Sequence, residues 1–404
     1  MRLLEINECN VGSTGQIMQN IAYAYDGDYL FAVANSRTNK ANKLEHCIYI
    51  GNRYSRNISL LFNKYTGING VLNWYSTKSF LKIINSYTPD IIHLHNLHNC
   101  YINLPILFQY IKSRKIPVIW TLHDCWAFTG QCPHFTLVKC DKWKTGCHDC
   151  PQYRNYPSSY FDRTKVMYKL KKKWFTNVKN MTIVTPSQWL ADLVKQSFLK
   201  DYPVRVINNG IDLSIFKPMP NDFRKKYGIP EDKYIVLGVA FGWGKRKGLD
   251  VFIALSQKLD SKKYQIVLVG TDDVIDKILP KNIISIHRTH DPLELAQIYT
   301  SADVFANPSR EENFPTVNIE ALACGTPIVT FDIGGSAEIV SQGTGFVVTC
   351  DDIEGMKDAI IYLCSHKQHF TKSCLNRAKV YDMNNRFQEY SKLYLEKCGE
   401  SNAS

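Results

Sequence analysis

Short apolar runs alternate with helical spans along this chain of 404 residues, and the alternation occurs in both halves. In the first half, strands are expected at 3–6, 29–34, 47–50, 91–94, 117–122 and 181–186, with helices at 16–25, 78–86 and 103–114. In the second half, strands are expected at 234–240, 265–269, 283–287, 304–306, 328–331 and 345–348, with helices at 249–259, 292–301 and 315–324. This alternation is typical of a parallel sheet covered by helices. We therefore expect an α/β fold, and the length favours two or three domains.

The join between the two halves is expected near 201–220, and a final amphipathic helix after residue 382. That helix is indicated by Phe387, Tyr390, Leu393 and Tyr394, which recur at helical spacing. No stretch approaches the roughly 20 apolar residues that are needed to span a bilayer. The first residues have the character of a strand rather than of a signal peptide, so a cytoplasmic location is expected.

The net charge is distributed unevenly between the two halves. Residues 1–205 contain 26 Lys plus Arg against 12 Asp plus Glu, a net charge of +14, whereas residues 206–404 contain 23 against 25, a net charge of −2. Such an asymmetry predicts a polyanionic or membrane-surface partner for the first half. Nucleic acid is the main alternative, but no helix-turn-helix, zinc-finger or RRM-like motif accompanies the charge.

The segment 160–180 carries much of this charge. Its cationic residues alternate with apolar ones and are Arg163, Lys165, Lys169, Lys171, Lys172, Lys173 and Lys179. A helix of this composition could dock on an anionic membrane surface. The same pattern fits a helix that packs on the core and exposes a solvated basic face. The sequence leaves these two interpretations open.

Two carboxylates, Glu312 and Glu320, lie eight residues apart where an apolar helix is expected to begin. Pro315 is a favourable first helical residue, which places Glu312 in the preceding loop and Glu320 on the helix. The free backbone N–H groups of Thr316 and Val317 would then form an anion site between the two carboxylates. This arrangement suits a sugar hydroxyl, a diphosphate and a ribose placed in a row. An amphipathic helix with incidental acids is the alternative.

The stretch 307–327 resembles the Glu-x7-Glu motif of the retaining family 4 glycosyltransferases of GT-B fold, and its end, Cys-Gly-Thr-Pro, also fits that family. The resemblance covers essentially the whole chain and extends to bacterial capsular, exopolysaccharide and colanic-acid-type transferases with a Cys-rich insert. It implies two Rossmann-like domains that face each other across a cleft. The acceptor-side domain would be 1–203 with the insert at 125–157, and the nucleotide-sugar domain 204–382. The segment 383–404 would return as a helix to the first domain.

The resemblance also implies roles for residues outside this motif. Lys247 matches the lysine that ends the phosphate-binding loop, and Arg246 is inferred to replace an arginine that most members carry where this chain has Gly242. His123 corresponds to the active-site histidine of the first domain, which faces the donor sugar. Gly15 belongs to a glycine-rich first loop through which the backbone approaches the donor phosphate or the acceptor. The family linker is matched by Asn209, Gly210 and Asp212.

Within the motif, the resemblance implies that Glu312 binds a donor-sugar hydroxyl and Glu320 the ribose hydroxyls. The implied donor-binding set is completed by Asn313, Phe314, Thr316 and Val317. GT-B enzymes generally neutralise the leaving diphosphate with basic side chains and a helix N-terminus. No cofactor is therefore expected for the chemistry.

Three histidines, His93, His95 and His98, lie on an expected strand and directly after it. Strand alternation puts His93 and His95 on the same side. The sequence places no acid or cysteine near them, so a structural and cleft-lining role is expected rather than a metal site.

Four cysteines of the insert, Cys132, Cys140, Cys147 and Cys150, fall within nineteen residues. Their spacing is compatible with one structural zinc ion, and His134 or His148 could replace a cysteine ligand. Thiols that merely pack, or a redox pair, are the alternatives.

Together these features predict a retaining transferase that moves a sugar from a UDP- or GDP-sugar to a glycan or lipid-linked saccharide in cell-surface polysaccharide biosynthesis. We expect it in the cytoplasm, peripherally at the inner face of the membrane, with no nucleic-acid partner. A sugar-nucleotide epimerase or a phosphorylase of the same fold leaves Glu312 and Glu320 unexplained. A basic, zinc-containing nucleic-acid-binding protein has no use for a near-neutral second half.

Overall fold

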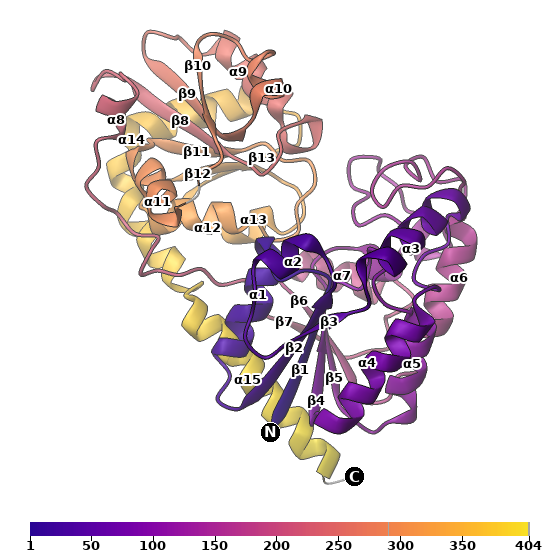
Figure 1. Cartoon of the computed structure of the whole chain (residues 1–404). Coiled ribbons are helices and arrows are strands. Elements are labelled where there is room, and N and C mark those ends of the chain that lie inside the picture. The colour runs from indigo at the N-terminus through magenta and orange to yellow at the C-terminus, as the bar shows by residue number, and fades with distance from the viewer. Residues whose placement is uncertain (290, 403–404) are drawn as a thin grey trace. The chain divides into compact units, whose positions relative to one another are not determined.

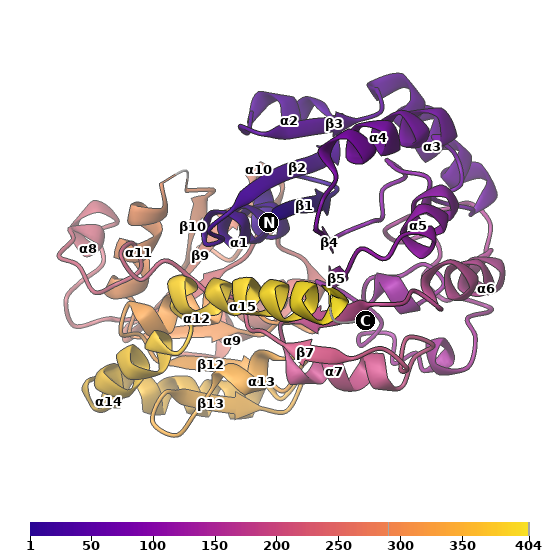
Figure 2. The same ribbon diagram turned by 90° about the horizontal axis from the view of Figure 1, so that it is seen from below.

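The computed structural model describes residues 1–289 and 291–402 and divides the chain into two compact units. Unit 1 contains Met1–Asn208 together with the chain from Arg386 onward, and unit 2 contains Asn209–Asn385. Each unit is built on one parallel sheet with helices packed against it (Figures 1 and 2). The expected α/β fold with two such sheets is confirmed.

Unit 1 has a seven-stranded sheet in the order β3-β2-β1-β4-β5-β6-β7. The strands are β1 (Arg2–Asn7), β2 (Asp28–Ala34), β3 (Cys47–Ile50), β4 (Ile91–Leu94), β5 (Val118–Thr121), β6 (Met181–Thr185) and β7 (Val204–Val206). The helices are α1 (Gly12–Tyr23), α2 (Arg37–Ala41), α3 (Arg53–Thr66), α4 (Trp74–Tyr87), α5 (Leu104–Ser113), α6 (Thr164–Phe175), α7 (Gln188–Lys195), α15 (Met383–Asn402) and the 3-10 turns η1 (Trp126–Phe128) and η2 (Lys142–Lys144). The strand order changes direction between β1 and β4, and open α/β sheets bind ligands at the carboxyl ends of the strands at such a point.

Unit 2 has a six-stranded sheet in the order β10-β9-β8-β11-β12-β13. The strands are β8 (Tyr234–Val239), β9 (Tyr264–Thr271), β10 (Ile283–His287), β11 (Val304–Asn307), β12 (Ile328–Phe331) and β13 (Gly345–Val348). The helices are α8 (Phe223–Lys226), η3 (Lys245–Lys247), α9 (Leu249–Lys258), α10 (Asp273–Asp276), α11 (Pro292–Ser301), α12 (Thr316–Ala323), α13 (Ser336–Ile339) and α14 (Ile353–Lys379). Here the strand order changes direction between β8 and β11, which places the loops after these two strands at the position favoured for a ligand.

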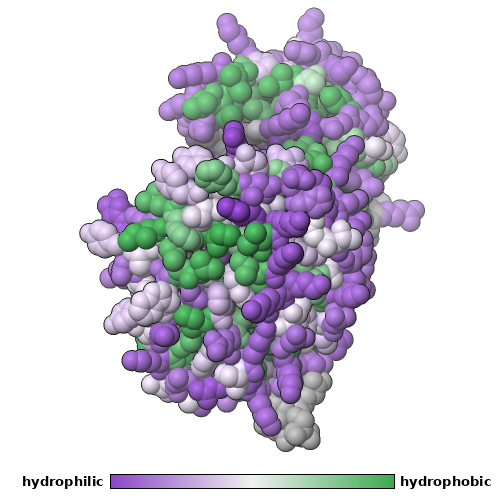
Figure 3. All heavy atoms as spheres, turned by 90° about the vertical axis from the view of Figure 1, so that its right-hand side faces the viewer, coloured by the Kyte–Doolittle hydropathy of each residue, from purple (hydrophilic) through white to green (hydrophobic). Residues whose placement is uncertain are grey.

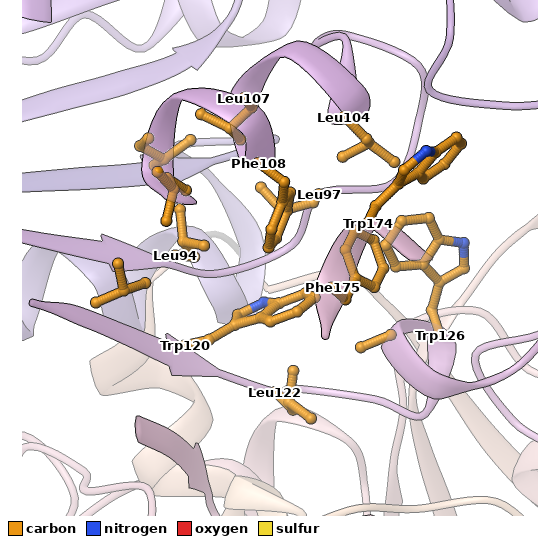
Figure 4. Packing of buried hydrophobic residues seen from close by; sticks show 14 of the residues in the cluster. Leu94, Leu97, Leu104, Leu107, Phe108, Trp120, Leu122, Trp126, Trp174 and Phe175 are labelled. Carbon is orange, nitrogen blue, oxygen red and sulfur yellow. The ribbon is translucent and has the colours of Figure 1, made fainter. Parts of the chain in front are cut away.

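The core of unit 1 is aromatic where α5 and α6 cover the sheet (Figure 4). The ring of Phe175 on α6 lies 4.6 Å from that of Phe108 on α5 and 4.9 Å from that of Trp120 on β5, measured between ring centroids. Tilted and edge-on aromatic pairs of this kind stabilise a core beyond their buried area. The apolar side of α6 is thereby fixed on the sheet.

Five strands have the expected bounds, namely 47–50, 91–94, 283–287, 328–331 and 345–348. Strand β7 lies inside the stretch interpreted as the join and pairs with β6 in the sheet of unit 1. Helices α3 and α14 were not expected. The pattern argument assumes that an amphipathic helix buries its apolar side, and several large apolar residues of α3 are instead exposed.

Candidate active site

The basic loop after β8 ends at η3 and is held close to the chain that follows β11. Gly248 adopts the left-handed conformation with φ 74°, and a Cβ at this position would lie 2.4 Å from the carbonyl oxygen of Pro308. Only glycine permits so close an approach. Lys247 forms an ion pair with Glu312, and their side chains are 18% and 13% exposed, whereas Arg246 is exposed. The structure thus brings together two of the residues to which donor binding was assigned.

Arg310 braces this loop and was not identified from the sequence. It is buried, and its Nη1 and Nη2 each lie 2.8 Å from a carboxylate oxygen of Asp250, while its Nε lies 2.7 Å from Asp351. Its backbone N–H donates to the carbonyl oxygen of Arg246 over 2.9 Å. A bidentate guanidinium contact is geometrically specific, so Arg310 fixes the loop beside Glu312. The sequence shows only that an arginine lies two residues before Glu312, and this alone does not reveal its bracing role.

Helix α12 begins one residue later than expected, because Pro315 is its N-cap and Thr316 its first residue. The preceding loop is tightly packed: Gly335 donates its N–H to the Asn313 carbonyl oxygen over 2.7 Å, and the ring of Phe314 is buried against Tyr381. A Cβ at Gly334 would clash with the backbone of Glu312, which makes glycine necessary there. Thr316 and Val317 stand in the first turn of α12, as expected for an anion site.

Glu320 lies on α12 within hydrogen-bond reach of Tyr299, whose hydroxyl donates to its Oε2 over 3.1 Å. Burial of the carboxyl raises the pKa of Glu320 to about 7, although the hydrogen bonds from Tyr299 and Thr316 act in the opposite direction. Near neutral pH this carboxyl therefore exchanges between its protonated and ionised forms. Glu312 and Glu320 lie on the same loop-and-helix element, as the motif predicted.

In unit 1, buried polar side chains from three neighbouring strands form a hydrogen-bonded cluster. Glu5 of β1 contacts His93 of β4 through Oε1 at 3.1 Å and His95 through Oε2 at 2.7 Å. The second ring nitrogen of His95 lies 2.9 Å from Nε2 of His123, which follows β5. The cluster is joined from α15 by Tyr394, whose hydroxyl lies 2.6 Å from Nδ1 of His93. The side chains of Glu5, His93 and His95 are all buried.

This cluster corrects the expectation that no acid lies near the two histidines. Glu5 pairs with His93 across the β1/β4 ladder although 88 residues separate them. The contact depends on β1 and β4 being neighbours in the sheet, and the residue sequence near His93 carries no signal of that order. Parallel neighbours are joined through long crossovers, so their side-chain contacts are nonlocal.

The contacts fix the protonation pattern of His95 and His123. Burial alone would raise the pKa of Glu5, but its contacts with His93 and His95 outweigh burial and lower that pKa to about 2, so Glu5 is an ionised acceptor. Burial is the main reason why the pKa of His95 is lowered to about 4, which makes its ring neutral. A neutral His95 that donates from Nε2 to Glu5 must accept at Nδ1, so Nε2 of His123 is the donor between the two rings.

Gly15 lies in the first turn of α1, where a Cβ would come within 2.4 Å of the backbone carbon of Asn10. The missing side chain lets the loop before α1 pack closely on that helix. His98 lies 3.0 Å from the hydroxyl of Tyr156 through Nδ1 and 3.4 Å from Asp124 through Nε2. His98 therefore belongs to a separate set of contacts from His93 and His95.

The cysteines Cys132, Cys140, Cys147 and Cys150 line one small cavity of the insert. The N–H of Gly130 donates to the sulfur of Cys147 over 3.1 Å. Burial raises the pKa of Cys132 to about 12 and that of Cys147 to about 11. Where the chain is described, the groups whose three ligand atoms lie within 4.8 Å of one another are Glu5 with His93 and His95, and Asp273 with Asp276 and His287. The four sulfurs are therefore more widely spread than those groups.

Lys171 lies inside unit 1, although it was expected on a basic surface. Its Nζ donates to the carbonyl oxygens of Trp126 and Thr129 over 2.7 and 3.2 Å and stands 3.5 Å from the centre of the Trp126 ring. Burial lowers the pKa of Lys171 to about 7. Since Lys172 and Lys173 are exposed while Phe175 is buried, α6 packs on the core and exposes a basic side. No helix among the described residues is long and apolar enough to cross a membrane.

Comparisons with known proteins agree with this architecture. Residues 220–382 match the family model described as glycosyl transferases group 1, and residues 49–215 match the model described as glycosyltransferase family 4. WcaC of Escherichia coli, named for colanic acid biosynthesis, is 27% identical over 276 residues, which are 66% of this chain and 65% of WcaC. An uncharacterized protein of the Klebsiella pneumoniae cps region is 23% identical over 98% of this chain and its own full length.

Solved structures share the fold at low identity. Sucrose-phosphate synthase from Thermosynechococcus elongatus superposes with a TM-score of 0.72 at 19% identity, covering 98% of each chain. Anabaena HepE in complex with UDP-glucose superposes with a TM-score of 0.69 at 16% identity, covering 97% of this chain and 99% of its own.

Proposed function

The chain belongs to the group 1 glycosyltransferases of family 4 and has their GT-B fold, and from this premise we propose that it is a retaining enzyme that uses a nucleotide-diphosphate sugar. The observation that carries the donor proposal is the ion pair of Lys247 with Glu312 beside the first turn of α12. Both lie on loops that follow the central strands β8 and β11, where the strand order of unit 2 changes direction.

Transfer requires the charge of the leaving diphosphate to be neutralised as it develops. Lys247 and the exposed Arg246 supply two positive charges, and the N–H groups of Thr316 and Val317 add the favourable end of the α12 dipole. Glu312 is oriented by Lys247 and braced through Arg310, which suits it to accept a hydrogen bond from a donor-sugar hydroxyl. Glu320 is assigned to the ribose hydroxyls, and the chemistry needs no metal ion.

His123 is proposed to contact the donor sugar. It stands at the carboxyl end of β5 and is held by His95, and a group at such a strand end is well placed to meet a ligand. The likeness to WcaC and to the cps-region protein supports an acceptor that is a glycan or lipid-linked saccharide of cell-surface polysaccharide assembly.

The donor proposal is tested by thermal unfolding in the presence of UDP, GDP and their sugars. A ligand at about 100 times its Kd contributes about 2.7 kcal/mol, which corresponds to a rise in Tm of several degrees for a chain of this size. HepE, which has been solved with UDP and UDP-glucose, makes UDP-sugars the first choice. Lys247→Ala should abolish the shift and Lys245→Ala, at an exposed neighbouring position, should keep it. If no nucleotide sugar shifts the Tm of wild type, the donor proposal is wrong.

We also propose that the four insert cysteines hold one structural zinc ion. Their shared cavity and the N–H bond to the Cys147 sulfur support this, and the wide spacing means that the thiols would draw together around the ion at about 2.3 Å each. Metal analysis should find close to one zinc ion per chain, and Cys140→Ser with Cys150→Ser should lose it while Cys47→Ser keeps it. A folded, active and metal-free preparation would exclude the zinc ion.

A further inference from the structure

Helix α3 is inverted relative to an ordinary surface helix, because its apolar side faces outward. Tyr54, Ile58, Leu61 and Tyr65 recur at the spacing of one helix face and are each 55–81% exposed. The buried residues of the same helix are polar, Ser59 and Asn63. The core of unit 1 does not account for the four outward apolar residues.

The exposed apolar residues of α3 continue onto neighbouring segments. The ring centroid of Tyr160 lies 5.2 Å from that of Tyr65. The Nζ of Lys64 also lies 5.2 Å from the Tyr160 centroid. Trp74 and Tyr75 begin α4, and Gly51, just before α3, lies against Ser76 of that helix. Figure 3 faces this side of unit 1 and shows hydrophobic side chains gathered among hydrophilic ones. We call Tyr54, Ile58, Leu61, Tyr65, Trp74, Tyr75 and Tyr160 the aromatic face.

The charge around the aromatic face is predominantly positive, although Asp162, two residues after Tyr160, is an exposed acid. Helices α3, α4, α5 and α6 together contain eleven Lys and Arg residues and no Asp or Glu. Of these cations Lys171 is buried and Arg56 pairs with Glu8, whereas Arg53, Lys64 and Lys172 are exposed. Exposed apolar surface on a monomer marks a site of interaction.

We propose that the aromatic face is a docking surface for an anionic lipid bilayer. Tyr and Trp side chains favour the level of the lipid head groups, and Lys and Arg beside them are attracted to anionic lipids. A second copy of this chain is disfavoured as the occupant, because a two-fold contact would bring two predominantly cationic surfaces together. The inference does not depend on the proposed donor or acceptor.

Sedimentation with vesicles tests the proposal. Vesicles of equal parts phosphatidylglycerol and phosphatidylcholine should bind the full chain at low salt, and vesicles of phosphatidylcholine alone should bind it weakly. Ile58→Gln with Leu61→Gln should lower the partition coefficient about tenfold, since two apolar side chains no longer enter the interface. Arg53→Gln with Lys64→Gln, which removes the two exposed cations of α3, should lower the partition coefficient about fivefold per charge and reduce its salt dependence.

The matched control lies in unit 2, where Val274 and Ile278 are 70% and 58% exposed beside Asp272, Asp273 and Asp276. Val274→Gln with Ile278→Gln removes equally exposed apolar groups and should leave vesicle binding unchanged. Each variant should keep the wild-type Tm and donor response, which separates this test from that of the donor site. The proposal is overturned if wild type does not sediment with the anionic vesicles, or if the double glutamine variant at Ile58 and Leu61 binds them as wild type does. It is also overturned if sedimentation without vesicles reveals a dimer that this variant loses, because the face would then be an interface between copies.

Discussion

The two units use ionisable side chains in opposite ways. In unit 1, Glu5, His93 and His95 are sealed from solvent and hydrogen-bonded to one another, with His123 attached at the edge. In unit 2, Lys247 and Glu312 form a pair that keeps part of each side chain exposed. A closed buried network holds one geometry, whereas a partly exposed ion pair can exchange a partner for a ligand. We therefore expect unit 1 to position a group and unit 2 to receive a ligand.

The largest effect is expected where unit 2 would meet the donor. Lys247→Ala and Glu312→Ala should each reduce kcat/KM for sugar transfer about 10² to 10³-fold, because each removes a charged contact near developing charge. Steady-state turnover with the donor identified by thermal shift measures this, and Lys245→Ala serves as the control. Turnover within about threefold of wild type for either variant would be incompatible with the assigned site.

A second effect arises from the partly buried acid of the same unit. The pKa of Glu320 is raised to about 7, above its ordinary value of 4.5, so the folded chain binds this proton more tightly than the unfolded chain. The contribution to stability is therefore present below pH 4.5 and is lost as the pH rises to about 7. Glu320→Gln does not titrate and should gain up to about 3 kcal/mol relative to wild type over that window.

Denaturant unfolding of both proteins across the pH range measures this difference. The difference in the free energy of unfolding should grow between pH 4.5 and about 7 and level off at higher pH. A difference that is the same at every pH would mean that Glu320 has the same pKa in the folded and the unfolded chain, so that folding does not desolvate this carboxyl.

The same contrast explains what the sequence could predict. Glu312, Asn313 and Glu320 lie on one loop and the helix that follows it, so their spacing along the chain fixes their arrangement and the motif was recognisable. Glu5 and His93 meet only because β1 and β4 are neighbours in the sheet, which no local pattern encodes. The burial of Lys171 was not predicted for a similar reason. Helical spacing shows which residues share one side of α6, but which side packs on the core depends on Phe108, Trp120 and the rest of the unit.

A smaller effect is expected from the buried cluster of unit 1. Glu5→Gln keeps the size of the side chain but removes the charge that holds His95 as a donor, so both tautomers of His123 become populated. We expect kcat to fall about tenfold with little change in the KM for the donor, the size of effect typical of groups that orient a functional residue. Imidazole 15N shifts should report His123 protonated at Nε2 in wild type and a mixture in the variant.

Tyr394→Phe is the matched control for that cluster. It removes the hydroxyl that contacts His93 and donates to Oε1 of Glu5, and it leaves the contacts from Oε2 of Glu5 through His95 to His123 in place. It should lower the Tm while kcat and the His123 shifts stay close to wild type. If Glu5→Gln and Tyr394→Phe behave alike, the cluster supports only the fold of unit 1 and does not orient His123.

The smallest effect should be that of divalent ions on transfer itself, and it separates the two units most directly. In unit 2 the leaving diphosphate is assigned to Lys247, Arg246 and the first turn of α12, so Mg²⁺ or Mn²⁺ supplies no charge that the chain lacks. Adding either ion to protein assayed with a chelator should change turnover less than about twofold. In unit 1 a zinc ion on the insert cysteines would act on stability, so stripping it should lower the Tm before it lowers turnover per folded chain. A rise in turnover of about tenfold with Mn²⁺ would place a metal at the donor diphosphate and would require the roles of Lys247 and Arg246 to be reassigned.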